Sequence, residues 1–260
     1  MKNSFILILL FCSANSFAQL AETIRSGRPG QAIGSYAVGA KVFQMQTGID
    51  YGGLQNDVFN FSQNSFNPNT VLRFGLTEKI EINTGWAYQY EQYETPFISS
   101  ERSGLSQSTI GTRINIIEAN NYLPAVGIQV TMKLPILSPD YNVSFIAPRI
   151  MAIANQKLAE KLALTLNLGI DYNGVNAQPT GVYVANLSYA MTNKFGVFLE
   201  NYGDFGQSFY NTFWDAGLSY LINNDLQLDV LGGLALNDDN MRYFLSVGVS
   251  WRFVAWHQSN

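Results

Sequence analysis

The sequence predicts an all-β protein, a transmembrane antiparallel up-and-down β-barrel of about twelve strands. Three observations lead there. Charged residues make up only 13% of the 260 residues, roughly half of the usual share of about 25%. After the N-terminus no apolar run approaches the about 18 residues that a transmembrane helix needs. Apolar residues instead alternate with small or polar ones, which is the period of a β-strand.

The N-terminus has the features of a secretory signal peptide. Lys2 supplies the positive charge, an apolar stretch runs from Phe5 to Cys12, and Ser16-Phe17-Ala18 places small residues at the positions that a signal peptidase reads. We therefore predict a signal peptide over residues 1–18, with cleavage after Ala18. The remaining chain is expected to divide into a periplasmic N-terminal segment (19–40), the barrel (41–253) and a C-terminal tail (254–260).

The strands differ in how clearly they alternate. The stretch KIEINTGWAYQYEQY (79–93) carries large apolar residues at one set of positions and small or polar residues at the other. The same strict alternation is found over 43–51, 70–76, 110–116, 126–134, 162–172 and 242–253. Less regular strands are expected over 143–153, 181–190, 194–203 and 212–221, with a short Gly-rich strand at 226–234.

The expected connections mostly alternate in length. Long polar loops are predicted at 52–68 and 93–106, with others at 135–142, 173–180 and 203–211. Short turns are predicted at 77–79, 118–121, 191–193 and 222–225. An even number of strands with long and short connections in turn is typical of outer-membrane barrels.

The apolar face is predicted to point outward, into lipid. The other face consists mainly of Gly, Ala, Ser, Asn and Gln, which is too poor in charge for a soluble surface. Aromatic residues also gather near strand ends, as in the two girdles of a membrane barrel. They are Trp86, Tyr88, Tyr90, Tyr172, Tyr189, Trp251 and Phe253. A secreted soluble carrier with its apolar face inward remains an alternative.

The polar face would then line the lumen and carries charges of both signs. The candidate lumen-lining residues are Arg73, Glu81, Glu91, Arg113, Lys133, Arg149, Asp171, Glu200, Asp215, Asp229, Arg242 and Arg252. Two interpretations stay open. The charges could select a solute in a pore, or they could pair across a narrow interior and close it.

Catalytic, cofactor and nucleic-acid functions find no support in the sequence. The one histidine, His257, lies in the C-terminal tail, so a Ser-His mechanism has no base in any strand. We expect no enzyme activity, no cofactor and no bound metal. The net charge is −4 without a basic block, so no nucleic-acid partner is expected.

Several short motifs resemble those of one family. They are Arg28-Pro29 followed by KVFQMQTG (41–48), LRFGLTEKIEIN (72–83), Gly111-Thr112-Arg113, Ala147-Pro148-Arg149, Asp215-Ala216-Gly217 and the stretch LQLD (226–229). In these the chain resembles the outer-membrane transporter proteins grouped under the meta-pathway of phenol degradation. The resemblance implies a barrel in the outer membrane with a role in uptake, in some members of aromatic compounds.

We therefore expect an outer-membrane channel or transporter that passes a small solute, with aromatic or hydrophobic compounds as candidates. Outer-membrane lipid is an expected partner. The barrel-assembly machinery is another, because SVGVSWRF (246–253) resembles the C-terminal signal that it reads. The second hypothesis is a non-conducting structural or interaction barrel.

Overall fold

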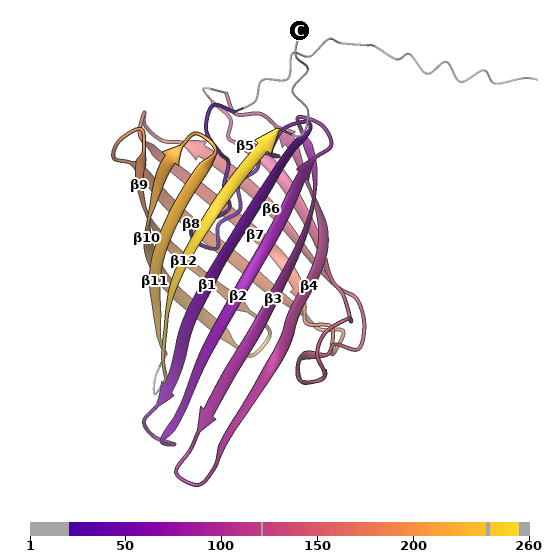
Figure 1. Cartoon of the computed structure of the whole chain (residues 1–260), viewed down its shortest axis with the longest axis vertical. Helices are drawn as coiled ribbons and strands as arrows, with labels where there is room; N and C mark the ends of the chain where they lie inside the picture. Colours follow the sequence, from indigo (N-terminus) through magenta and orange to yellow (C-terminus); the bar gives the residue numbers. More distant parts are fainter. Residues whose placement is uncertain (1–20, 121, 238–239, 255–260) are drawn as a thin grey trace, which may run out of the picture.

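Twelve antiparallel strands form one closed barrel in the computed structural model, which describes residues 21–120, 122–237 and 240–254 (Figure 1). Each strand pairs with its neighbours in sequence, and β1 closes the barrel against β12 from Val42↔Val254 to Asn56↔Asn240. The predicted strand number and topology are confirmed. The predicted cleavage after Ala18, and His257, lie outside the described residues.

The strands run from nine to nineteen residues. They are β1 (Val42–Asn56), β2 (Phe61–Gly75), β3 (Ile80–Glu94), β4 (Ser99–Ile117), β5 (Ala125–Lys133), β6 (Ala147–Lys157), β7 (Leu162–Tyr172), β8 (Pro179–Ala190), β9 (Phe195–Phe205), β10 (Tyr210–Asn223), β11 (Leu226–Asn237) and β12 (Asn240–Val254). A short 3₁₀ turn, η1 (Pro139–Tyr141), lies between β5 and β6. Over the described ranges, no helix has the length and apolar character to cross a membrane.

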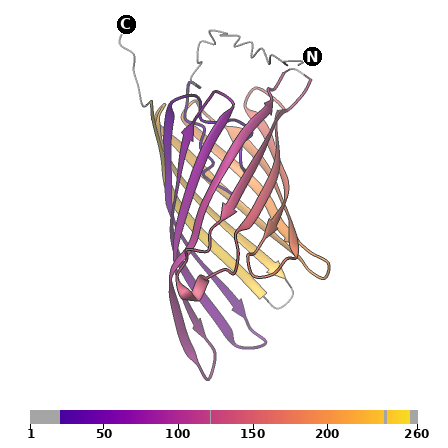
Figure 2. The same cartoon turned by 90° about the vertical axis from the view of Figure 1, so that its right-hand side faces the viewer.

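The barrel has two distinct ends. The start of β1 and the end of β12 lie together at one end, which we call the terminal end (Figures 1 and 2). At the opposite end, the hairpin end, the β1–β2 and β3–β4 hairpins project furthest (Figure 2). The prediction of long loops at 52–68 and 93–106 was wrong. Most of these residues continue the strands, which leaves only residues 57–60 and 95–98 as turns.

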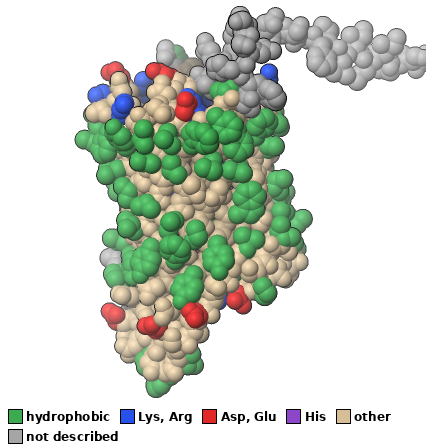
Figure 3. Space-filling view, in the orientation of Figure 1, with side chains coloured by type: hydrophobic (Ala, Val, Ile, Leu, Met, Phe, Trp, Pro, Cys, Tyr) green, Lys and Arg blue, Asp and Glu red, His purple; other side chains and the backbone are tan. Residues whose placement is uncertain are grey.

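Side chains alternate between the outside and the lumen as predicted. On β3, Ile82, Trp86 and Tyr88 are exposed on the outside, whereas Glu81 and Glu91 are buried inside. Figure 3 shows apolar side chains covering the barrel between charged groups at its two ends. A barrel with this exterior is built to face lipid. The alternative with the apolar face inward is therefore wrong.

Aromatic residues mark two levels on the outer wall. Tyr189, Tyr220, Trp251 and Phe253 are exposed near the terminal end of their strands. Tyr51, Phe66, Tyr88, Tyr90, Tyr210 and Trp214 are exposed toward the hairpin end. Two such levels are expected where a barrel meets the two membrane–water interfaces, because aromatic rings with a polar edge favour that region.

Residues 21–41, which we call the luminal segment, enter the barrel at its terminal end (Figure 1). Their backbone makes hydrogen bonds with side chains from opposite walls, including Glu81 on β3 and Glu200 on β9. The sequence analysis expected residues 19–40 to lie outside the barrel. The difference has a physical reason: this segment has no strand partner, and the polar lumen supplies donors and acceptors for its backbone groups.

The connection between β5 and β6 covers the part of β4 that lies toward the hairpin end. Pairing between β4 and β5 ends at Thr109↔Lys133, although β4 begins ten residues earlier at Ser99. There Ser138 N donates to Leu105 O at 3.1 Å, and Leu105 N donates to Ser138 Oγ at 2.8 Å. Tyr141 Oη donates to Glu91 at 3.0 Å. Burial and this hydrogen bond raise the pKa of Tyr141 to about 12, so its hydroxyl keeps its proton at neutral pH.

Candidate functional site

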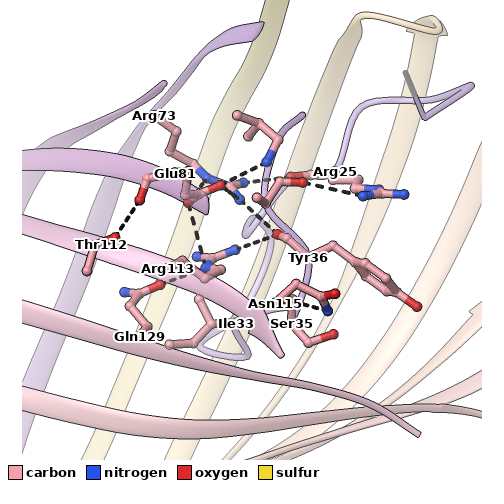
Figure 4. A network of polar contacts seen from close by, with 12 residues as sticks. Arg25, Ile33, Ser35, Tyr36, Arg73, Glu81, Thr112, Arg113, Asn115 and Gln129 are labelled. Carbon is pink, nitrogen blue, oxygen red and sulfur yellow. Dashed lines mark hydrogen bonds and ion pairs between the residues drawn. The ribbon is translucent and has the colours of Figure 1, made fainter. Parts of the chain in front are cut away.

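The first cluster in the lumen is a buried group of three charges on β2, β3 and β4 (Figure 4). Arg73 grips the Glu81 carboxylate with two hydrogen bonds, Nε to Oε1 at 2.8 Å and Nη2 to Oε2 at 2.7 Å. Arg113 Nε lies 3.7 Å from Glu81 Oε1. All three side chains are at least nine-tenths buried. Two arginines therefore neutralise one carboxylate in a region that water hardly reaches.

The three charged side chains of this cluster bind the backbone of the luminal segment as well as one another (Figure 4). Val38 N donates to Glu81 Oε2 at 2.9 Å. Arg73 Nη1 donates to the carbonyl oxygen of Arg25 at 2.7 Å. The three charges thus form the wall side of a docking site for two stretches of backbone. Since each bond involves an ionised group, it is stronger than a bond between neutral groups.

A second carboxylate holds the segment on the opposite wall. Glu200 on β9 accepts from Gln31 N at 2.6 Å and from Ala32 N at 2.9 Å. Gly30, with a φ of +93°, leads into this turn. A Cβ at this position would lie 3.1 Å from Glu200 Oε2. Glycine is therefore required here for its conformation and for the close approach to the carboxylate.

The side chain of Arg28 fixes the segment to a third part of the wall. Its guanidinium lies 3.2 Å from Asp229 Oδ1 on β11 and 2.7 Å from Ser246 Oγ on β12. Beneath it are the register partners Gly48 and Gly248. A Cβ on either would come within 2.5 Å of the guanidinium atoms. The lack of side chains at these two glycines thus leaves the space that the Arg28 guanidinium occupies.

Neutral side chains complete the docking. Asn167 on β7 holds both backbone groups of Ile33, since it accepts from the nitrogen at 2.8 Å and donates to the oxygen at 2.9 Å. Ser26 Oγ lies 2.7 Å from Ser250 Oγ on β12. Sequence reasoning missed Arg28 and Asn167 as docking residues. Asn167 occupied an inward position of the alternation, but nothing indicated its partner.

The luminal segment lies between cavities on its two sides. A cavity of about 690 Å³ opens toward the terminal end, and one of about 420 Å³ lies toward β2–β5. Gly27, Arg28 and Ala32 line both. These segment residues therefore separate the two spaces.

Three further cavities, of about 270, 370 and 350 Å³, lie toward the hairpin end. Tyr202 on β9 lines all three. Its ring stacks on Phe213 of β10, with centroids 5.2 Å apart and planes at 12°. Arg242 on β12 holds its guanidinium 5.8 Å from the Phe213 centroid. The lumen thus has aromatic surface on the hairpin side of the luminal segment. The sequence analysis identified neither Tyr202 nor Phe213.

The twelve predicted lumen residues all occupy inward-facing positions of their strands, but they serve different contacts. Six touch the luminal segment: Arg73, Glu81, Arg113, Glu200, Asp229 and Arg252. Glu91 pairs with Arg102, and Arg149 lies 3.7 Å from Asp171. Lys133 and Arg242 lie toward the hairpin end. Asp215 is buried directly opposite Glu200 in the strand register.

The described ranges contain no group of three or more His, Cys, Asp or Glu side chains that could hold a metal ion. Six of the predicted charged residues instead contact the luminal segment, whereas both carboxylate oxygens of Asp215 are buried without a hydrogen-bond partner among the described residues. Their arrangement provides binding and electrostatic neutralisation.

Sequence comparison identifies one family. The family model described as "Putative MetA-pathway of phenol degradation" matches residues 26–253, which is most of the chain. None of the curated protein sequences matches the chain.

Several solved structures share the fold. An outer-membrane channel from Pseudomonas putida F1 is 14% identical, with a TM-score of 0.66 over 88% of this chain and 100% of that one. The translocator domain of the autotransporter NalP from Neisseria meningitidis is 10% identical, with a TM-score of 0.58 over 82% and 89%. The CymD monoaromatic hydrocarbon channel is also 10% identical, with a TM-score of 0.52 over 93% and 100%. At these identities the likeness concerns the fold.

Proposed function

Because the chain belongs to the family described as "Putative MetA-pathway of phenol degradation", we propose that it is an outer-membrane channel for a small solute. The luminal segment closes this channel, and its displacement opens it. The observation that carries the proposal is the course of the segment, which separates the cavity that opens toward the terminal end from the cavity beside β2–β5, inside a barrel with a lipid-facing exterior.

The way the segment is held supports an opening that leaves the barrel intact. Every strand bonds to two neighbours, so the wall has no free edge. The segment instead rests on individual hydrogen bonds and on the ion pair between Arg28 and Asp229. Each such contact contributes about 0.5–3 kcal/mol, so the segment can leave the wall in steps while the strands remain paired.

The proposed solute is a small molecule, with aromatic compounds included. Two similar structures are described as an outer-membrane channel and as a monoaromatic hydrocarbon channel. The rings of Tyr202 and Phe213 provide a surface on which an aromatic solute could rest. Since similar folds also serve as translocator domains, the fold alone does not determine the cargo.

The proposal includes the route to the membrane. The predicted signal peptide, cleaved after Ala18, would direct export, and the barrel-assembly machinery would insert the strands. The terminal end would then face the periplasm and the projecting hairpins the outside. No catalytic step belongs to this function, and none of the proposed residues needs a cofactor.

A reversible disulfide tests whether the segment moves. Ser26 and Ser250 have their Oγ atoms 2.7 Å apart, which fits the short Cβ separation of a disulfide. The sequence has one other cysteine, Cys12, inside the predicted signal peptide. In a planar lipid bilayer, the purified Ser26→Cys/Ser250→Cys protein should conduct less when oxidised and recover its current on reduction.

The single variants Ser26→Cys and Ser250→Cys are the matched controls and should be insensitive to reductant. An equal current in the oxidised and reduced double variant would contradict a moving segment. If deletion of residues 21–40 also gave no current, the non-conducting barrel, with the segment as a permanent filling, would replace the channel.

A further inference from the structure

One of the lumen cavities has a lining unlike that of the others. The cavity of about 370 Å³ at the hairpin end is lined by four aromatic residues, by Arg242 and by residues 52–54, Gln63 and Ser65 of β1 and β2. The aromatic residues are Tyr202, Phe213, Tyr243 and Phe244. Its volume lies within the range of about 300–1,000 Å³ that is common for small-molecule sites. Four aromatic side chains and one arginine, from β9, β10 and β12, therefore line a space of ligand size.

The rings in this cavity are fixed by their packing. Tyr202 and Phe213 stack at 5.2 Å. The Phe244 ring lies over Gly233 of β11, where a Cβ would come within 2.3 Å of it. Because these rings are already held in place, a ligand that stacks on them pays little for ordering the site.

Arg242 adds a positive charge at the edge of the rings. Its guanidinium lies 5.8 Å from the Phe213 centroid. In the described part of the chain, no carboxylate lies within 4.0 Å of it. Arg149, in contrast, already has Asp171 at 3.7 Å.

We propose that this cavity binds an aromatic carboxylate of the size of benzoate. The arene ring stacks against Phe213 and Tyr202, and the carboxylate accepts hydrogen bonds from the fork of Arg242. This inference rests on the proposed channel function, which it deepens by naming a class of solute. A neutral arene lacks the group for Arg242, whereas a saturated carboxylate lacks the planar face.

The test measures binding rather than transport. Isothermal titration of the purified barrel in neutral detergent micelles uses three probes of similar size: benzoate, cyclohexanecarboxylate and benzyl alcohol. Benzoate should bind about tenfold or more tightly than either of the others, because it alone uses both the rings and the guanidinium.

Two variants separate the two contributions. Arg242→Gln should weaken benzoate binding about tenfold, which corresponds to about 1.4 kcal/mol, without changing the binding of benzyl alcohol. Phe213→Leu should reduce the preference for benzoate over cyclohexanecarboxylate. Lys79→Gln is the matched control, since it removes one exposed positive charge from the turn at the terminal end. Heat-dependent gel mobility establishes that each barrel is folded.

Equal affinity for benzoate and cyclohexanecarboxylate, or a full affinity for benzoate in Arg242→Gln, would overturn the site. The outcome is independent of the disulfide experiment. A barrel that binds benzoate but gives no current would support this site and contradict the channel function. A barrel that conducts but does not prefer benzoate would support the channel function and contradict this site.

Discussion

At the scale of single residues, the lumen is held together by a small number of buried charges. Glu81 is fully buried and has contacts with Arg73, Arg113 and the backbone of Val38. Such a carboxylate is tolerated in a dry environment only because its charge is neutralised and its oxygens are hydrogen-bonded. The two arginines depend on it in the same way.

Replacing Glu81 with Gln should therefore destabilise the barrel. The change leaves two buried guanidinium groups without a counter-charge, for which a loss of about 3–5 kcal/mol in the free energy of unfolding is expected. Urea unfolding in lipid vesicles, followed by tryptophan fluorescence, measures it. Glu118→Gln breaks an exposed ion pair with Lys79 and should change little. Equal effects of the two variants would contradict the role given to burial.

The sequence predicted where these charges face but not what they bind. The alternation of β3 was enough to turn Glu81 inward, because one polar position follows each apolar one. Its partner Val38 lies in a segment without any period, and so does Arg28. A contact between a strand and an irregular segment depends on the folded path of both, which no local pattern encodes.

At the scale of elements, the hairpin end departs most from the sequence-based expectation. The stretches at 52–68 and 93–106 are rich in Gly, Asn, Ser and Pro, which are typical of loops. They are nevertheless paired as strands over most of their length. Beyond the lipid both faces of a hairpin meet water, so the alternation that identifies a strand is lost while its backbone pairing continues.

The attachment of the β5–β6 connection to β4 can be tested through one hydroxyl. Ser138→Ala removes the acceptor of Leu105 N. A loss of about 1 kcal/mol of local stability should make exchange of the Leu105 amide about fivefold faster. Hydrogen exchange with mass spectrometry of overlapping fragments measures it. The Arg113 amide, in the part of β4 that pairs with β5, serves as the internal reference. An unchanged rate at Leu105 would contradict the attachment.

At the scale of the whole molecule, the fold follows from the division between an apolar exterior and a polar interior. Low charge and a strand period with large apolar residues on one face predicted a closed barrel, because lipid tolerates no unpaired strand edge. Strand number was recoverable because each strand carried its own pattern. The position of the luminal segment inside the barrel could not be predicted, since a polar inner face accommodates water and a polar segment equally well.

Because the exterior faces lipid, the cost of a charged substitution should depend strongly on how deep in the membrane the residue lies. Leu168, 61% exposed at the middle of β7, faces the apolar core of the membrane. Leu168→Arg should lower the free energy of unfolding in vesicles by about 2–4 kcal/mol. Leu158→Arg is the matched control in the turn between β6 and β7, where the new charge reaches water. Similar losses at both positions would mean that Leu168 does not lie within lipid.

Because the luminal segment is covalently joined to β1, it behaves as an intramolecular ligand of its own barrel. Tethering to a nearby site gives such a ligand an effective concentration in the millimolar range, far above that of a dilute solute. The luminal segment and a solute then compete for the lumen, and the outcome does not depend on the amount of protein in the membrane. A substitution on the wall that weakens the binding of the segment changes the ratio of occupied to vacated lumen by tenfold for about every 1.4 kcal/mol.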